Sequence, residues 1–201
     1  MTTIAILDYG MGNLRSVHRA VDRMGGSPLV TADPTEVATA KALVVPGVGH
    51  FGACMRNLRE RGLDRVIREF AATERPLLGV CLGMQVLFDW SEEGAVEGLG
   101  LLRGKVRRLP ATVTVPHMGW NDVAWRAANP LTAGIPGGSR FYFVHSYVCE
   151  ADDDLVVGET EHGLRFPAVV ASGNVVATQF HPEKSSDAGL ALYRNLIRSA
   201  A

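Results

Sequence analysis

Apolar residues in the first ninety positions follow two patterns in turn: short continuous runs, and runs at helical spacing. Continuous runs bounded by turn residues are typical of buried strands, whereas recurrence every three or four residues is typical of helices. A helix start is also predicted at Asp33, which suits the N-cap position, with Pro34 at the first helical position and Glu36 at the third. We predict strands at 4–10, 28–31, 41–45 and 76–80, and helical segments at 14–24, from Asp33, at 51–73 with a break at Gly62, and at 84–90.

The pattern changes after residue 100 to short β-like runs separated by Gly, Pro and Asn. These runs are 101–109, 122–126, 141–149 and 155–160, followed by a strand at 175–180 and a helix at 188–198. The alternation in the first half predicts a parallel sheet. The predicted fold class is therefore α/β, an open and mostly parallel sheet flanked by helices, with antiparallel additions. We find no repeat or linker and expect one domain, 1–201.

Composition excludes several classes of partner. A chain of 201 residues with 47% hydrophobic content can bury a core of its own, and its net charge of −1 provides no bulk attraction to nucleic acid or to an anionic membrane. The N-terminus lacks a basic segment followed by a long apolar one, and no apolar run approaches membrane-spanning length, so we expect a cytoplasmic protein. Residues 10–13 lack the third glycine of a dinucleotide fingerprint, and we expect no cofactor.

The three cysteines are too few and too widely spaced for a disulfide framework or a zinc site. His117 and His145 have no partner at metal-ligand spacing, so no metal is expected. Cys54 and Cys149 are interpreted as buried apolar residues.

Cys81 differs from the other two cysteines because glycines stand two positions before it and two positions after it. A nucleophile on a sharp strand-to-helix turn needs small residues at those two positions, where side chains do not fit. Backbone N–H groups at the start of the following helix lower a thiol's pKa and can hold an oxyanion. The pattern predicts that Cys81 is an attacking thiol.

His181 follows the strand predicted at 175–180, and Glu183 comes two residues later. In an extended segment such residues share a face, so Glu183 could orient His181 as the base that activates the thiol. The alternative is a structural cysteine together with a surface His-Pro-Glu turn.

The loops at 10–13 and 46–49, the Cys81 turn and the 181–183 segment all follow strands. In an open α/β sheet such loops gather at the carboxyl edge, where ligands bind. Backbone N–H groups of 46–49 could face a developing oxyanion beside the N–H of Leu82. An ordinary tight turn is the alternative for 46–49.

The motifs at 79–85 and 181–183 resemble those of class I, triad-type glutamine amidotransferases. Further blocks are similar to the glutaminase subunits of imidazole glycerol phosphate synthases. These blocks lie at 8–14, 46–49, 116–121, 141–147 and 179–185.

This resemblance implies hydrolysis of L-glutamine to glutamate and ammonia through a thioester on Cys81, with His181 moving protons and Glu183 orienting it. It also implies an oxyanion site and a site for the amino-acid end of glutamine. The oxyanion residues are Gly47, Val48 and Leu82, and the substrate residues are Gly49, Gln85, Glu93, Ser146 and Tyr147.

The resemblance further implies a partner, a (β/α)₈ cyclase that receives the ammonia in histidine biosynthesis. Residues at positions that face the cyclase in the family are Asn13, Trp120, Asn121, Tyr142 and Lys184. Exposed aromatic side chains suit an interface, although plain core packing is an equal alternative for Trp120.

Two other functions remain open. One is a glutaminase that serves anthranilate or aminodeoxychorismate synthesis, against which the 116–121 block and Val48 weigh. The other is a non-catalytic amidotransferase-like domain, which the intact Cys81, His181 and Glu183 disfavour.

Overall fold

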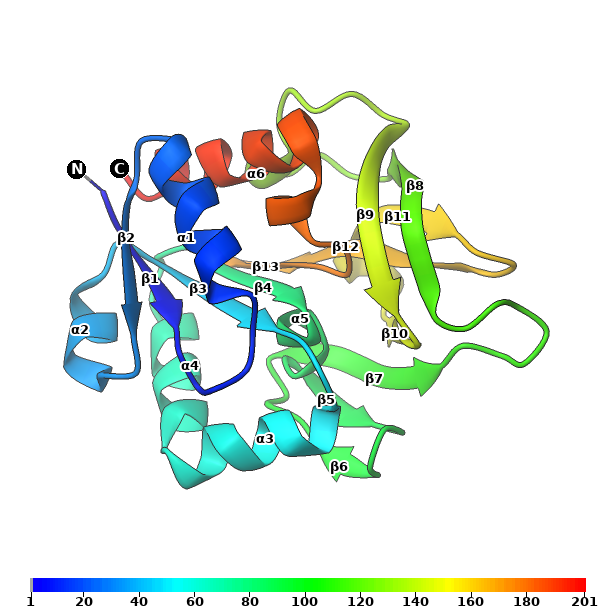
Figure 1. Cartoon of the computed structure of the whole chain (residues 1–201), viewed down its shortest axis with the longest axis horizontal. Coiled ribbons are helices and arrows are strands. Elements are labelled where there is room, and N and C mark those ends of the chain that lie inside the picture. The colour runs from blue at the N-terminus through cyan, green and yellow to red at the C-terminus, as the bar shows by residue number, and fades with distance from the viewer. Residues whose placement is uncertain (1) are drawn as a thin grey trace.

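A large twisted sheet forms the centre of the molecule (Figure 1). The computed structural model describes residues 2–201, and within them this sheet has nine strands in the order β2-β1-β3-β4-β13-β12-β11-β8-β9. The five strands from β2 to β13 run parallel, and every later pair is antiparallel. The strands are β1 (Thr3–Leu7), β2 (Ser27–Thr31), β3 (Ala42–Gly47), β4 (Leu77–Cys81), β8 (His117–Trp125), β9 (Ser139–His145), β11 (Val156–Glu161), β12 (Arg165–Ser172) and β13 (Val175–Thr178).

Helices cover both faces of the parallel half (Figure 1). One face packs against α1 (Leu14–Arg23) and α6 (Ser186–Ser199), and the other packs against α2 (Pro34–Thr39), α3 (Phe51–Glu60) and α4 (Leu63–Ala71). Both faces are apolar because side chains alternate along a strand: Ile4 and Ile6 join one core, Ala5 and Leu7 the other. The predicted fold class is confirmed.

Local sequence accounts for the helix boundaries on the second face. The Asp33 side chain accepts a hydrogen bond of 2.7 Å from the N–H of Thr35, and Pro34 follows at the first helical position. Gly62, with φ at +66°, separates α3 from α4 at the predicted break.

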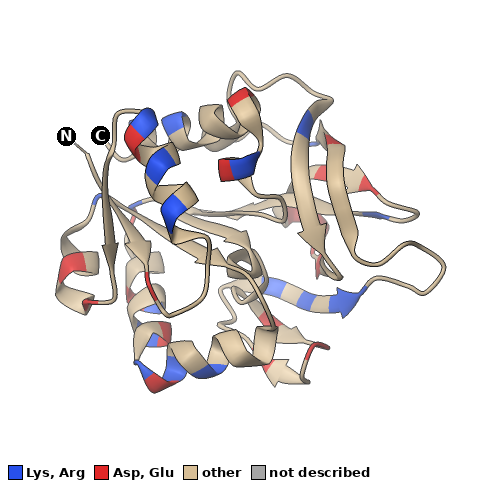
Figure 2. Cartoon of the chain, in the orientation of Figure 1, with Lys and Arg blue, Asp and Glu red and all other residues tan. Residues whose placement is uncertain are grey.

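A second sheet, in the order β10-β7-β5-β6, lies beside the large one. It contains β5 (Phe88–Ser91), β6 (Val96–Glu97), β7 (Leu102–Arg108) and β10 (Tyr147–Ala151). The basic residues of β7 are exposed or half-buried, and Figure 2 shows them as blue bands along the strand. Arg103 there pairs with Asp152 and Asp154.

Two predictions of secondary structure are wrong. The helix predicted at 84–90 is only the single turn α5 (Leu82–Gln85), and Phe88–Ser91 forms strand β5. A short apolar run is compatible with either state, and pairing with β7, which puts Phe88 opposite Leu102, decides for the strand. The predicted strand 141–149 is divided at Ser146, because β9 and β10 belong to different sheets.

Three short 3₁₀ turns complete the described elements: η1 (Pro130–Thr132), η2 (Asp153–Leu155) and η3 (Pro182–Lys184). None of the helices in residues 2–201 has the length and apolar character needed to cross a membrane.

Candidate active site

The sequence motifs meet at the carboxyl edge of the parallel strands. Strand β4 ends at Cys81, and the register of β3 places Gly47 beside it. Strand β13, on the other side of β4, leads to His181. This edge is where an open α/β sheet binds its ligands.

Cys81 sits on a strained turn between β4 and α5. Its φ of +56° lies in a region that non-glycine residues rarely adopt, and such strain is concentrated at functional sites. The two flanking glycines are required by space. A Cβ at Gly79 would stand 2.8 Å from the carbonyl oxygen of Gly83, and a Cβ at Gly83 would stand 1.8 Å from that of Val45. The turn therefore has the geometry of a nucleophile elbow.

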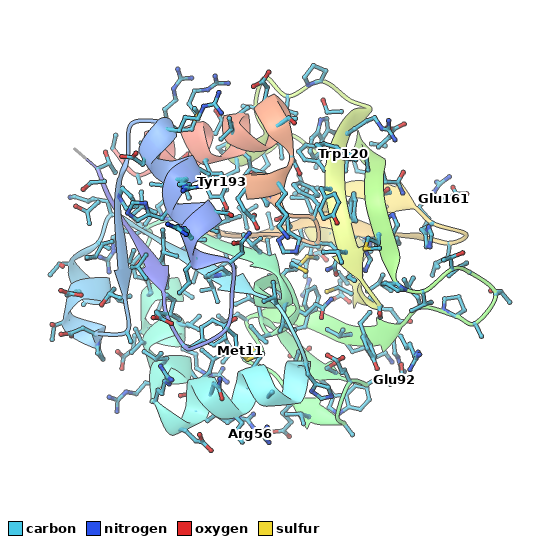
Figure 3. All side chains as sticks on the ribbon, in the orientation of Figure 1. Met11, Arg56, Glu92, Trp120, Glu161 and Tyr193 are labelled. Carbon is cyan, nitrogen blue, oxygen red and sulfur yellow. The ribbon has the colours of Figure 1, made fainter. Side chains whose placement is uncertain are left out.

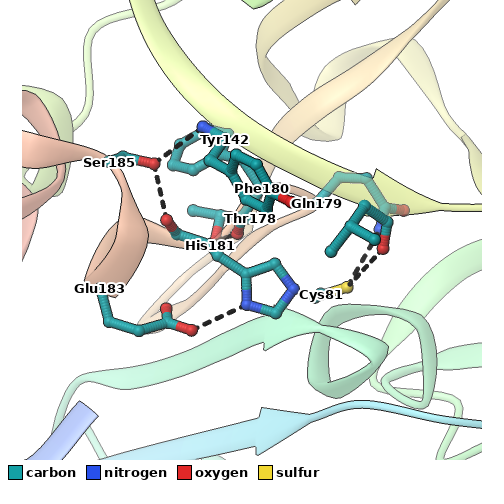
Figure 4. A network of polar contacts seen from close by, with 9 residues as sticks. Cys81, Tyr142, Thr178, Gln179, Phe180, His181, Glu183 and Ser185 are labelled. Atoms are coloured by element: carbon teal, nitrogen blue, oxygen red, sulfur yellow. Dashed lines mark hydrogen bonds and ion pairs between the residues drawn. The ribbon is translucent and has the colours of Figure 1, made fainter. Parts of the chain in front are cut away.

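His181 and Glu183 form a buried pair. Nδ1 of His181 lies 2.8 Å from Oε1 of Glu183, and the two side chains are 2% and 1% exposed. The pair is made through the 3₁₀ turn η3, whereas the sequence argument assumed an extended segment. The other ring nitrogen, Nε2, has no hydrogen-bond partner within residues 2–201 and points toward Cys81 (Figure 4).

Backbone contacts hold His181 in place from strand β9. The N–H of His181 donates to the carbonyl of Tyr142 at 2.9 Å. The Ser185 hydroxyl donates to the carbonyl of His181 at 2.6 Å and accepts from the N–H of Tyr142 at 2.9 Å (Figure 4). The imidazole is thus fixed by main-chain bonds on one side and by Glu183 on the other.

The charge environment favours a protonated His181. Burial lowers the pKa of His181, but the neighbouring Cys81 sulfur and then the Glu183 carboxylate raise it more, from 6.5 to about 10. Since no hydrogen bond of ordinary geometry joins Nε2 to Cys81, the proximity of the sulfur carries that effect. His181 can therefore hold a proton beside the thiol at neutral pH.

The other two cysteines are free, buried and chemically quiet, which confirms their interpretation as apolar residues. Burial raises the pKa of Cys54 to about 12 and that of Cys149 well above its usual value. Thiols in such surroundings stay protonated and are poor nucleophiles.

A cavity of about 260 Å³ opens beside Cys81 and His181. This is near the lower end of ligand-site volumes and suits a small molecule. Its lining includes all five residues predicted to hold the amino-acid end of a substrate, namely Gly49, Gln85, Glu93, Ser146 and Tyr147. Oε2 of Glu93 also accepts a 2.6 Å hydrogen bond from the N–H of Phe51, at the start of α3.

The residues predicted for the oxyanion site surround the same thiol. Val48 and Leu82 line the cavity, and Gly47 is the β3 residue opposite Cys81. A side chain at Gly47 would collide with the backbone nitrogen of Gly83 at 2.6 Å, so close packing of the two loops depends on this glycine.

Some contacts at the site were not anticipated from the sequence. Nε2 of Gln179 lies 3.8 Å from Sγ of Cys81, and the carbonyl of Val144 lies 3.9 Å from the same sulfur. His145 and Pro116 also line the cavity. The one local sign in the sequence that Gln179 lies near the site is its position two residues before His181.

Three of the five predicted interface residues lie together: Trp120 on β8, Tyr142 opposite it on β9, and Lys184 in η3. Trp120 (labelled in Figure 3) is 44% exposed, and its ring centroid is 6.2 Å from that of Tyr142. Nζ of Lys184 lies 5.6 Å from the centroid of the Tyr142 ring. Core packing of Trp120 is thereby excluded. Met118, which was not predicted, is 65% exposed and shares the Trp120 face of β8.

The other two predicted interface residues come from the start of α1 and from the opposite face of β8. Asn13 is at the N-cap position of α1 and is half-buried. The Asn121 side chain belongs to the opposite face of β8, where it bonds to His117 and to the carbonyl of Glu161. Within residues 2–201, no three or more His, Cys, Asp or Glu side chains are grouped so as to hold a metal ion.

The model of the glutamine amidotransferase class-I family matches residues 5–198 of this sequence. The chain belongs to that family. As a class-I glutamine amidotransferase it is an enzyme, and Cys81 and His181 line a single cavity.

Relatives of this class-I amidotransferase are similar over its whole length. The imidazole glycerol phosphate synthase subunit HisH of Moorella thermoacetica is 52% identical, covering 100% of this chain and 98% of the relative. The HisH of Aromatoleum aromaticum is 49% identical, covering 98% of each chain.

Solved structures support the fold. A structure described as a glutamine amidotransferase matches with a TM-score of 0.78 at 24% identity, covering 98% of each chain. PurLQS from Thermotoga maritima matches with a TM-score of 0.77 at 19% identity, covering 98% of this chain and 97% of that one.

Proposed function

We propose that this chain is the glutaminase subunit of an imidazole glycerol phosphate synthase and supplies ammonia for histidine biosynthesis. The observation that carries the proposal is the near full-length identity of about half to HisH subunits, in a chain whose cysteine, histidine and glutamate stand around one cavity. We also propose that residues 1–201 form a single amidotransferase domain and that the protein works in the cytoplasm.

In the proposed reaction, His181 takes the thiol proton of Cys81 and, because its pKa is raised, holds it while the resulting thiolate attacks the side-chain amide carbon of glutamine. His181 then gives this proton to the leaving nitrogen, the C–N bond breaks, and ammonia departs from a Cys81 thioester. Water attacks the thioester, His181 takes its proton and returns it to sulfur, and glutamate is released. Glu183 keeps the ring oriented and stabilises its protonated form, as its 2.8 Å contact allows.

The tetrahedral intermediates carry negative charge on the former amide oxygen. We assign their stabilisation to the N–H of Leu82 and the peptide between Gly47 and Val48, which flank Cys81. Oriented backbone N–H groups at such a position are typically worth about 3–4 kcal/mol each.

The amino-acid end of glutamine would be held by the polar part of the cavity. Glu93 supplies a negative charge suited to the substrate ammonium group, and the 146–147 segment and Gln85 supply hydrogen-bonding groups. This leaves the side-chain amide of glutamine directed toward Cys81.

We propose that a (β/α)₈ cyclase binds the face formed by Met118, Trp120, Tyr142 and Lys184, with Asn13 at its margin. Exposed aromatic side chains and methionine are enriched in interface cores. An interface is needed because ammonia released into water would be protonated and lost to the acceptor.

Replacement of Cys81 by Ala tests the assignment. Purified with its co-purifying partner, Cys81→Ala should release no glutamate from glutamine but should support full cyclase activity on added ammonium salts. The matched control is Cys54→Ala, which removes a buried thiol that does not line the cavity and should keep glutamine-dependent activity. Co-purification of a chorismate-using synthase instead of a cyclase would contradict the proposal.

A further inference from the structure

Residues 144–147 form one wall of the cavity, at the place where the chain passes from the large sheet to the small one. Strand β9 ends at His145 and β10 begins at Tyr147. The carbonyl of Tyr147 accepts hydrogen bonds from two side chains: Nδ1 of His145 at 2.9 Å and Nε2 of Gln85 at 3.0 Å. One of these two side chains, His145, has no part in the proposed mechanism.

The direction of the His145 contacts follows from the acceptor. A carbonyl cannot donate, so Nδ1 of His145 carries the proton. Nε2 of His145 lies 3.0 Å from Nδ1 of His117, and two protonated nitrogens cannot face each other at that distance. Burial first, and His117 next, lower the pKa of His145 to about 3, so its ring is neutral and Nε2 accepts.

The same reasoning fixes His117. Its Nδ1 must donate to His145, so its Nε2 accepts, and Nδ2 of Asn121 lies 3.2 Å from it. The Asn121 amide is oriented independently, since Nδ2 also donates to the carbonyl of Glu161 at 2.8 Å and Oδ1 accepts from the N–H of Asp122 at 2.9 Å. The hydrogen bonds from Asn121 through His117 and His145 to Tyr147 therefore allow only one assignment of donors and acceptors.

The chain continues from Tyr147 to the nucleophile. Gln85 uses its second N–H to reach Oε1 of Gln179 at 3.1 Å, and Nε2 of Gln179 lies 3.8 Å from Sγ of Cys81. Gln85, Gln179, His117 and His145 are all nearly inaccessible to solvent. In such surroundings an unmatched donor or acceptor is costly, so these hydrogen bonds favour a single arrangement of the side chains.

We propose that His145, oriented by His117 and Asn121, is a positioning residue for glutamine, because it fixes the Tyr147 carbonyl and with it the wall of the cavity that holds the substrate. The inference rests on the proposed glutaminase function and adds to it a pair of histidines that touch neither the reacting atoms nor the nucleophile. It predicts an effect on substrate binding rather than on the chemical steps.

Two substitutions of His145 separate hydrogen bonding from shape. His145→Leu removes the donor to Tyr147 and leaves Nδ1 of His117 without an acceptor, so KM for glutamine should rise about tenfold while kcat stays within threefold. His145→Asn places an N–H close to the original Nδ1 and should bring KM back to within threefold of wild type. Ammonium-dependent cyclase activity should be unchanged in both.

His162 provides a matched control. Its ring stacks on His117 with centroids 4.2 Å apart, but its own hydrogen bond goes to the carbonyl of Thr114, outside the chain. His162→Phe keeps the stacking and should leave KM for glutamine unchanged.

A spectroscopic readout decides the point even where a variant fails to fold. Nitrogen-15 NMR of the wild-type full chain should show His145 as a neutral ring protonated at Nδ1. A His145 ring protonated at Nε2, or at both nitrogens, at pH 7 would overturn the inference. Two kinetic results would also overturn it: equal rises in KM for His145→Leu and His145→Asn, or a KM of His145→Leu equal to that of wild type. A wild-type chain that releases no glutamate with its cyclase would instead refute the proposed function itself.

Discussion

Glu183→Gln isolates the contribution of a single negative charge to the proposed triad. The glutamine side chain has nearly the same volume, and its amide oxygen can still accept from Nδ1 of His181, so the ring should keep its orientation. What disappears is the charge that stabilises the protonated ring across 2.8 Å, in a place where both side chains are almost completely buried. The pKa of His181 should therefore fall below about 10.

The magnitude follows from the burial of this pair. Removing one partner of a buried ion pair costs about 3–5 kcal/mol. The lower end applies because the hydrogen bond itself survives in the glutamine variant. About 3 kcal/mol corresponds to a loss of roughly a hundredfold in kcat for glutamine hydrolysis. KM should change little, since Glu183 is not part of the cavity lining.

The assay is glutamate release by the complex of this chain with its cyclase, with kcat and KM determined separately and the pKa of His181 followed by NMR. Glu161→Gln is the matched control, because that carboxylate is 67% exposed and pairs only with Arg165 at the surface. Thermal unfolding of both variants verifies that they are folded. A Glu183→Gln enzyme with kcat within threefold of wild type would refute the role given to Glu183.

Three further predictions concern stability and assembly. Gly83→Ala should prevent stable folding because its Cβ would lie 1.8 Å from a backbone oxygen. Gly173→Ala, at a position with φ at +56° and open space around it, should cost about 1 kcal/mol of stability. Equal losses of unfolding free energy in chemical denaturation would contradict this. The free energy of unfolding should decrease as pH falls from about 6.5 toward 4. The reason is that His145 has a pKa of about 3 in the folded protein, so over this pH range the unfolded chain binds a proton at His145 and the folded protein does not. Denaturation curves of His145→Asn should show a shallower decrease. Trp120→Ala should weaken binding of the cyclase by at least tenfold, measured by calorimetry, while Val30→Ala on edge strand β2 should have no effect; unchanged affinity of Trp120→Ala would exclude this face.

Much of the parallel half of the fold could be predicted from the sequence. Its strands are continuous apolar runs because both faces of the sheet are covered, and its helices have recognisable boundaries, such as Asp33 with Pro34 and the break at Gly62. The Cys81 turn was also predictable, because a sharp turn leaves no room for side chains at 79 and 83 and therefore requires glycines at these two positions.

The small sheet was harder to predict. Phe88–Ser91 carries an apolar pattern that suits a helix as well as a strand, and only the partner strand β7, some fifteen residues later, determines which one forms. In the same way, no residue in the continuous run 141–149 indicates that the chain leaves the large sheet for the small one at Ser146.

The chemical groups of the candidate site could be recognised from the sequence: a thiol between two glycines, a His-Pro-Glu segment, and an α/β order that brings both to one edge of a sheet. These features depend on neighbours within a few residues, or on the rule that parallel strands end at the same edge. The side chains that surround these groups could be identified only in the folded protein. His117, His145 and Asn121 lie on antiparallel strands whose register sets their hydrogen bonds, and Gln85 meets Tyr147 and Gln179 from distant parts of the chain. Such contacts have no fixed spacing in sequence, because packing of the folded chain selects them.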